Sequence, residues 1–119
     1  MMSAAQSVSE FFEIINKRDL SKLEEALTED AEFYFPKTQP LLGKNRIVRF
    51  FRILFRQYPE LAFKIRRQII QGPLAAIHWT NYGVNKSQEP YENEGVTILE
   101  IKGDKIGFIS DFFKDTEKF

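Results

Sequence analysis

The residue best placed to do chemistry is Asp111, in the apolar segment Ile109-Ser110-Asp111-Phe112-Phe113. Alternate side chains of a β-strand share a face, so Asp111 points inward if Ile109 and Phe113 do. A carboxyl group among apolar side chains has a raised pKa and can act as a general acid or base. The alternatives are a carboxylate that only hydrogen-bonds a neighbouring strand or helix, or one exposed by a register slip. Asp111 is therefore the candidate catalytic residue.

Other side chains are expected to line an apolar pocket beside this carboxylate. Trp79 and Asn81 fall on the same inward-facing side of one strand. The indole could stack on a planar ligand or simply fill the core, and the amide could orient a ligand carbonyl or bond only the backbone. The expected ligand-binding residues are Trp79, Asn81, Phe33, Phe35, Phe51, Asn93 and Thr97. The phenylalanines favour an apolar ligand, although plain core packing explains them too.

The composition argues against metal, thiol and triad chemistry. The chain has no cysteine, which removes disulfides, zinc–thiolate sites and thiol nucleophiles and fits a cytoplasmic location. Its only histidine, His78, is expected on the outer face of the strand that holds Trp79, and one histidine makes neither a metal site nor a triad. No apolar run reaches the ~20 residues that span a bilayer, and the N-terminus does not resemble a secretion signal. We expect no metal, no cofactor and no membrane partner.

The elements that must position these residues follow from the hydrophobic periodicity. The expected helices cover residues 8–15, 20–27 and 44–58, and the expected strands cover residues 31–35, 61–71, 74–84, 91–101 and 106–113. Ser7 with Glu10 is expected to cap the first helix and Asp19 the second. A slip of the alternation at Arg67-Gln68 predicts a β-bulge.

Strands that follow one another through short turns pair antiparallel, and the helices must then cover one face of the sheet. We therefore predict an α+β fold, a cone-shaped curved antiparallel sheet with three helices from the N-terminal half packed on its concave face. A chain of this length suits a single domain over residues 1–119, with a core of about residues 8–113 and a loose tail over 114–119.

The net charge is zero, but residues 44–67 hold eight basic residues against Glu60 alone. Four of the basic residues form a stripe on the polar side of the long helix: Arg46, Arg49, Arg52 and Arg56. They could bind phosphates, but no aromatic residues are interleaved on that face and no nucleic-acid motif accompanies them, which argues against nucleic acid. A solvated face, pairing with acidic segments of the same or another subunit, is favoured, and the role of the stripe stays open.

Several short segments carry a family resemblance. They are Asn16-Lys17-Arg18-Asp19-Leu20, Leu27-Thr28-Glu29-Asp30-Ala31, Gly43 before the long helix, Trp79, and Gly103-Asp104-Lys105-Ile106 before Asp111. In this order they resemble the nuclear transport factor two-like superfamily and, within it, the SnoaL-like polyketide cyclase branch. The resemblance covers the chain from about Val8 to Phe113. This superfamily includes enzymes, carriers and oligomerisation modules, so the resemblance implies the fold and not one activity.

Two catalytic patterns of the superfamily are largely missing. Ketosteroid isomerases need a tyrosine and two aspartates, and the matching positions here are Phe11, Phe35 and Gly95. Limonene epoxide hydrolases look similar at the C-terminus, where an aspartate precedes two aromatic residues as Asp111 does. The positions that match their tyrosine, asparagine, arginine and aspartate are Phe33, Phe35, Trp79 and Asn81. Polyketide cyclases of this branch use an aspartate acid/base near the pocket, and Asp111 is the nearest candidate by position.

Two hypotheses follow. In the first, the protein binds an apolar cyclic or aromatic compound, or isomerises or cyclises it by proton transfer without a cofactor; a hydrolase-like reaction is a variant. In the second, it is a non-catalytic binding or assembly module. It would form a homodimer through the outer sheet face, where His78, Tyr82, Val96 and Ile98 lie. The sequence gives neither the ligand, nor the pathway, nor whether turnover occurs.

Overall fold

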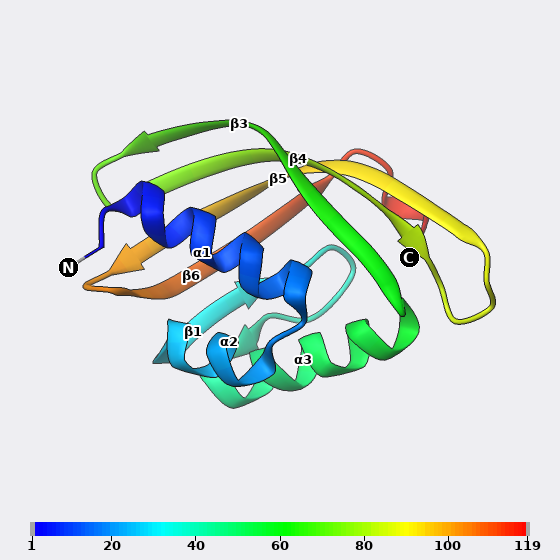
Figure 1. Ribbon diagram of the computed structural model, residues 1–119. Coiled ribbons are helices and arrows are strands. Elements are labelled where there is room, and N and C mark those ends of the chain that lie inside the picture. The colour runs from blue at the N-terminus through cyan, green and yellow to red at the C-terminus, as the bar shows by residue number, and fades with distance from the viewer. Residues whose placement is uncertain (1, 119) are drawn as a thin grey trace.

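The computed structural model describes residues 2–118 and places three helices against one face of a curved sheet (Figure 1). The elements are α1 (Ala4–Lys17), α2 (Leu20–Ala26), β1 (Leu27–Tyr34), β2 (Leu41–Leu42), α3 (Lys44–Gln57), β3 (Glu60–Gln71), β4 (Leu74–Val84), β5 (Pro90–Lys102), β6 (Lys105–Phe113) and a 3₁₀ turn (Thr116–Lys118). The strand order is β2-β1-β6-β5-β4-β3. The predicted α+β cone is confirmed, with one refinement: the sheet is mixed, because β1 and β6 pair in parallel.

The first helix begins earlier than predicted. Its N-cap is Ser3, whose hydroxyl accepts a hydrogen bond from the Gln6 amide while the Gln6 side chain accepts one from the Ser3 amide. The predicted cap of Ser7 and Glu10 is wrong, since Ser7 is buried one turn inside the helix. The residues after Ser3 are good helix formers, so α1 extends back to the earlier capping box. Asp19 caps α2 as predicted, accepting a hydrogen bond from the Lys22 amide at 3.1 Å.

Arg18 connects the first helix to the end of the third. It adopts a left-handed conformation with φ of 60° at the C-cap of α1. Its guanidinium donates hydrogen bonds to the carbonyl oxygens of Phe55, at 3.0 Å, and Tyr58, and it lies 4.9 Å from the Phe55 ring centroid. The last carbonyl groups of a helix lack partners inside that helix and attract cations. Arg18 therefore holds the C-terminal end of α3 in place.

The strand β1 also begins earlier than predicted, at Leu27. The second helix was expected to include residue 27 and to be closed by residues 28–30, but all of these lie in β1, where its register with β6 shifts between Leu27 and Glu32. The short edge strand β2 was not predicted, because two residues carry no periodicity. The predicted bulge in β3 is present beside its expected place, between Ile65 and Arg67.

The C-terminal segment is tied to the sheet. The Lys114 amide donates to the Glu94 carbonyl at 2.7 Å, and the Asn93 side-chain amide donates to the Asp115 carbonyl at 2.9 Å. On α3 the stripe Arg46, Arg49, Arg52 and Arg56 is exposed. None of these arginines forms an ion pair with another residue between 2 and 118. No helix in that range is long and apolar enough to cross a membrane.

Candidate functional site

A small cavity lies between α3 and the concave face of the sheet. Its volume is about 30 Å³, and its lining holds the carboxyl group of Asp111 and the side-chain amide of Asn81 together with two tyrosines, Tyr58 and Tyr91. Phe35 and Phe51, also expected at the site, form part of its wall. Four of the residues expected at the site from the sequence therefore line the same cavity.

A hydrogen-bonded chain leads from the only tryptophan to the Asp111 carboxyl group. The indole Nε1 of Trp79 donates to Thr97 Oγ1 at 2.8 Å, and Thr97 Oγ1 donates to Asp111 Oδ1 at 2.6 Å. Cross-strand register creates the second contact, because Thr97 and Asp111 are direct partners of β5 and β6. Trp79 and Thr97 thus do not line the cavity. They hold the Asp111 carboxyl group through hydrogen bonds.

The Asp111 carboxyl group is poised to exchange a proton near neutral pH. Its burial raises its pKa to about 7, and the hydrogen bond from Thr97 opposes this rise by stabilising the charged form. Desolvation dominates because the free energy that a carboxylate loses on leaving water is larger than the free energy it gains from one hydroxyl donor. Both protonation states are then populated at neutral pH, as general acid–base catalysis requires.

Asn81 brings a second polar group to the cavity without a protein partner. The residue is 6% exposed, and no described residue donates a hydrogen bond to its Oδ1. A buried acceptor without a donor costs roughly 1–3 kcal/mol. A cavity of about 30 Å³ has room for about one water molecule, which could supply that donor. The same position could be taken by a donor group of a ligand.

Aromatic rings fill most of the space that the cone would otherwise enclose. Phe33 is fully buried and stacks on Phe51 with their ring centroids 5.4 Å apart, so it lies behind the cavity wall. Phe35 contacts Phe50 at 4.7 Å and Phe113 at 5.0 Å between centroids. Phe35, Phe50 and Phe113 are partly exposed. Any ligand larger than water must displace some of these rings.

Asn93 also points inward, but its side chain serves the C-terminal segment instead of the cavity. Its amide nitrogen donates to the Asp115 carbonyl and, at 3.3 Å, to the Tyr91 hydroxyl. Its Oδ1 accepts from the Glu94 and Asp115 amides.

The cavity residues that were not proposed as site residues are Leu54, Tyr58, Leu61, Phe63, Tyr91 and Phe113. Their inward positions could be read from strand and helix periodicity, but their convergence needed the register.

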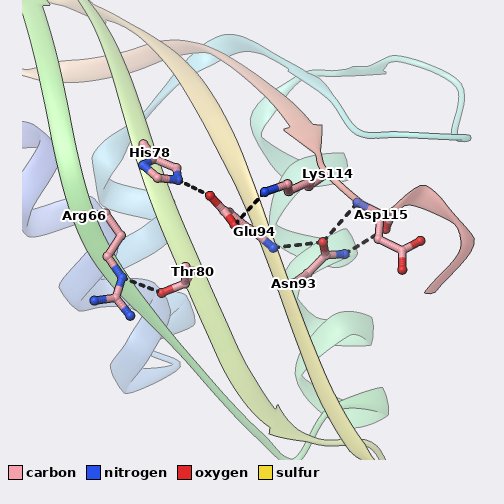
Figure 2. Close-up of polar contacts among 7 residues, drawn as sticks. All are labelled: Arg66, His78, Thr80, Asn93, Glu94, Lys114 and Asp115. Carbon is pink, nitrogen blue, oxygen red and sulfur yellow. Dashed lines mark hydrogen bonds and ion pairs between the residues drawn. The ribbon is translucent and has the colours of Figure 1, made fainter.

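The outer face of the sheet carries a separate polar network (Figure 2). His78 lies on this face as expected, and its Nε2 is 2.5 Å from Glu94 Oε2. Lys114 contacts the other carboxylate oxygen at 3.4 Å, and both partners lower the pKa of Glu94, His78 more than Lys114. Beside them, Arg66 Nε donates to Thr80 Oγ1 at 2.9 Å. In residues 2–118 no three His, Cys, Asp or Glu side chains are grouped to hold a metal ion.

Comparison with known proteins agrees with this architecture. A family model described as a SnoaL-like domain matches residues 8–107. An NTF2-like protein of unknown function from Burkholderia pseudomallei superposes with a TM-score of 0.88 at 19% identity, covering 99% of this chain and 95% of that one. No curated protein matches the chain.

Two further solved structures of the same fold bear functional names. A putative SnoaL-like polyketide cyclase from Jannaschia superposes with a TM-score of 0.83 at 16% identity, covering 93% of this chain and 85% of that one. An LEH-like epoxide hydrolase of M. tuberculosis superposes with a TM-score of 0.82 at 17% identity, covering 93% and 82%. At these identities the similarity shows a shared fold and no shared reaction.

Proposed function

Because the chain belongs to the SnoaL-like domain family, we propose that it binds a small, mainly apolar cyclic or aromatic molecule between the sheet and α3. In this proposal Asp111 exchanges a proton with the bound molecule. The observation that carries the proposal is a carboxyl group with a pKa of about 7 in an apolar cavity, beside the unpartnered Oδ1 of Asn81. A carboxylate with only a structural role would be stabilised more by an ion pair with a cation than by a position in an apolar cavity.

The roles of the two polar groups follow from their hydrogen-bonding capacity. Neutral Asp111 can donate its proton to a ligand carbonyl, and ionised Asp111 can remove a proton from a carbon next to a carbonyl. The Oδ1 of Asn81 can accept a hydrogen bond from a ligand hydroxyl, which would fix the ligand's orientation. Thr97 keeps one carboxyl oxygen fixed at 2.6 Å, so the other oxygen is left for the ligand.

Binding requires the partly exposed rings to move. A ring of the ligand can replace the contacts that Phe35 makes with Phe50 and Phe113, because offset and edge-to-face arrangements of aromatic pairs have similar energies. The ligand is thus expected to be planar and uncharged at its buried end. A negative charge would be repelled by ionised Asp111, and a positive charge would keep Asp111 ionised and prevent it from donating a proton.

Proton transfer can be tested without knowing the substrate. A panel of cyclic and aromatic ketones is incubated with the protein in D₂O, and exchange of the protons next to the carbonyl is followed by NMR. We expect catalysed exchange by the wild-type protein and a loss of about 10²–10⁴-fold in Asp111→Asn. Saturable change in Trp79 emission, through the Thr97 contact, reports binding in the same samples.

Asp30→Asn is the matched control, because it removes an exposed carboxylate of β1. Exchange should be unchanged in this variant. Equal exchange by Asp111→Asn and the wild-type protein would refute the acid–base role. Failure of every ketone to change the Trp79 emission or to exchange would refute the proposed ligand class.

A second candidate function, assembly as a homodimer, is favoured by exposed apolar side chains on the outer sheet face. Tyr82 is 63% and Phe112 60% exposed, whereas Val96 and Ile98 are partly buried. Ile69 and Leu74 are also exposed and belong to the same face, opposite the helices. Large exposed apolar side chains gathered on one face are typical of a protein interface.

Sedimentation velocity at micromolar concentration tests this interface. We expect a dimer for the wild-type protein and a monomer for Phe112→Glu, because a charge at the centre of an apolar interface loses its solvation. Ile53→Glu, on α3 at the opposite side of the sheet, changes another exposed apolar residue and should leave the dimer intact. A monomeric wild-type protein would overturn the assembly function and leave the ligand proposal standing.

A further inference from the structure

A second hollow, unrelated to the Asp111 cavity, runs between α1 and α2. Its volume is about 450 Å³, and its floor includes Phe11, Ile14 and Ile106. In Figure 1 the start of α1 and the turn between β5 and β6 lie at the same end of the molecule. Ile106 precedes Asp111 by five residues along β6, which is roughly 17 Å in an extended strand. This interhelical groove is therefore a separate site.

The floor of the interhelical groove combines apolar surface with one unsatisfied hydroxyl group. Phe11, Ile14 and Ile106 are each at least 96% buried, which gives the groove a dry base. Ser7 belongs to the lining and is 4% exposed, and its Oγ has no hydrogen-bond partner among the described residues. A buried hydroxyl without a partner is unfavourable. The Oγ atom is covered, so it can accept a hydrogen bond from a donor in the groove once the Ser7 side chain turns towards it.

The rim of the groove is acidic at the end where this hydroxyl lies. The short connection between the two helices brings Lys17 close to Asp19, so Ser7 and Ala26, which also line the groove, lie towards its opposite end. Glu10 and Glu25 line the groove on the Ser7 side of the charged pair Glu13 and Lys17, and Asp104 and Lys105 line it from the turn between β5 and β6. Neither glutamate forms an ion pair with another described residue.

At the other end the charges are already matched. Glu13 and Lys17 form an ion pair at 2.7 Å, which lowers the pKa of Glu13 and raises that of Lys17. Asp19 accepts the hydrogen bond that caps α2 and lies beside Lys22. A cation would therefore be attracted to the end of the groove near Ser7. The apolar floor extends from there along α1.

We infer that this groove binds a primary ammonium ion attached to a small apolar body. The ammonium group donates a hydrogen bond to Ser7 Oγ and is balanced by Glu10 and Glu25. The apolar part covers Phe11, Ile14 and Ile106. A neutral molecule would form no ion pair with these two exposed carboxylates, and a metal ion would lack the close oxygen ligands that it needs.

Backbone amide shifts of ¹⁵N-labelled protein test the inference with 2-phenylethylamine as the probe, at pH 7 and 150 mM salt. We expect saturable shifts at Phe11, Ile14 and Ile106, none at Asn81 or Asp111, and a dissociation constant of about 1–10 mM, as small ligands allow. The uncharged analogue 2-phenylethanol should bind at least about tenfold more weakly, since it cannot pair with the carboxylates.

Variants separate the groove from general electrostatics. Glu10→Gln combined with Glu25→Gln should weaken binding about tenfold, and Ser7→Ala about threefold to tenfold. The matched control combines Glu24→Gln with Asp30→Asn, which removes the same charge from exposed positions outside the groove. Alanine favours a helix, so Ser7→Ala should fold normally. Equal binding of the amine and the alcohol, equal weakening by the control, or absence of shifts at 50 mM probe would each overturn the inference.

Discussion

The Asp111→Asn variant is expected to be more stable than the wild-type protein at alkaline pH. Burial raises the pKa of Asp111 to about 7 in the folded protein, whereas an unfolded aspartate has a pKa near 3.9. A folded pKa above the unfolded one means that the folded state holds its proton more tightly. The contribution to stability is present below pH 4 and is lost as the pH rises through 7.

The size of this effect follows from the two pKa values. A difference of about three units corresponds to roughly 4 kcal/mol between pH 4 and pH 8.5. Asparagine has nearly the shape of aspartic acid and does not titrate, so Asp111→Asn should lack this loss. Other carboxylates titrate near pH 4 in both proteins, and the difference between the two proteins cancels their contribution.

Urea unfolding at half-unit steps from pH 4 to pH 8.5 measures this difference. The wild-type free energy of unfolding should fall by about 3–4 kcal/mol more than that of the variant. Asp30→Asn should follow the wild-type curve, because that carboxylate is exposed. Parallel curves for the wild-type protein and Asp111→Asn would show that the Asp111 carboxyl group is solvated and ionised. The acid–base proposal would then lose its basis.

Local patterns predicted most of the fold, because the burial of side chains repeats along each element. The four long strands and α3 lie where alternation and helical spacing placed them. The errors occurred where two local signals competed or where a distant partner decided the structure. Ser7-Glu10 and Ser3-Gln6 are both possible capping boxes. The helix propensity of the residues before Ser7 decides between them, because it allows the helix to begin at the earlier box. The polar residues 28–30 were expected to close the second helix, but they belong to β1, which pairs with the distant strand β6.

The lining of the candidate site was predicted in part, and its geometry was not predicted. Alternation along β6 and β4 gave the inward direction of Asp111 and Asn81, and both reach the cavity. The bond between Thr97 and Asp111 depends on the register of two strands, which no single strand contains. The volume of the cavity depends on how Phe33, Phe35 and Phe51 pack, and residue types alone do not set that volume.

Gly95→Ala is expected to destabilise the protein strongly and to disturb the chain of contacts that leads to Asp111. Gly95 pairs with Trp79 across β4 and β5. A Cβ atom at this position would lie 2.7 Å from Trp79 Cζ2 and too close to the Phe112 carbonyl oxygen. One contact is with a fully buried ring and the other with the backbone of β6, so neither can yield easily. Overpacking of this kind costs about 3 kcal/mol.

Gly107→Ala supplies the control, because the three atoms nearest to the added Cβ all belong to the side chain of Lys102, which can move away. We expect this variant to lose less than about 1 kcal/mol in urea unfolding, against about 3 kcal/mol for Gly95→Ala. The emission of Trp79 should change in Gly95→Ala alone, since the indole must shift away from Thr97. Equal stability and equal emission of the two variants would mean that the space around Gly95 is not closed by Trp79. In that case the indole would not fix the Thr97 hydroxyl that holds Asp111, and the carboxyl group would be free to turn.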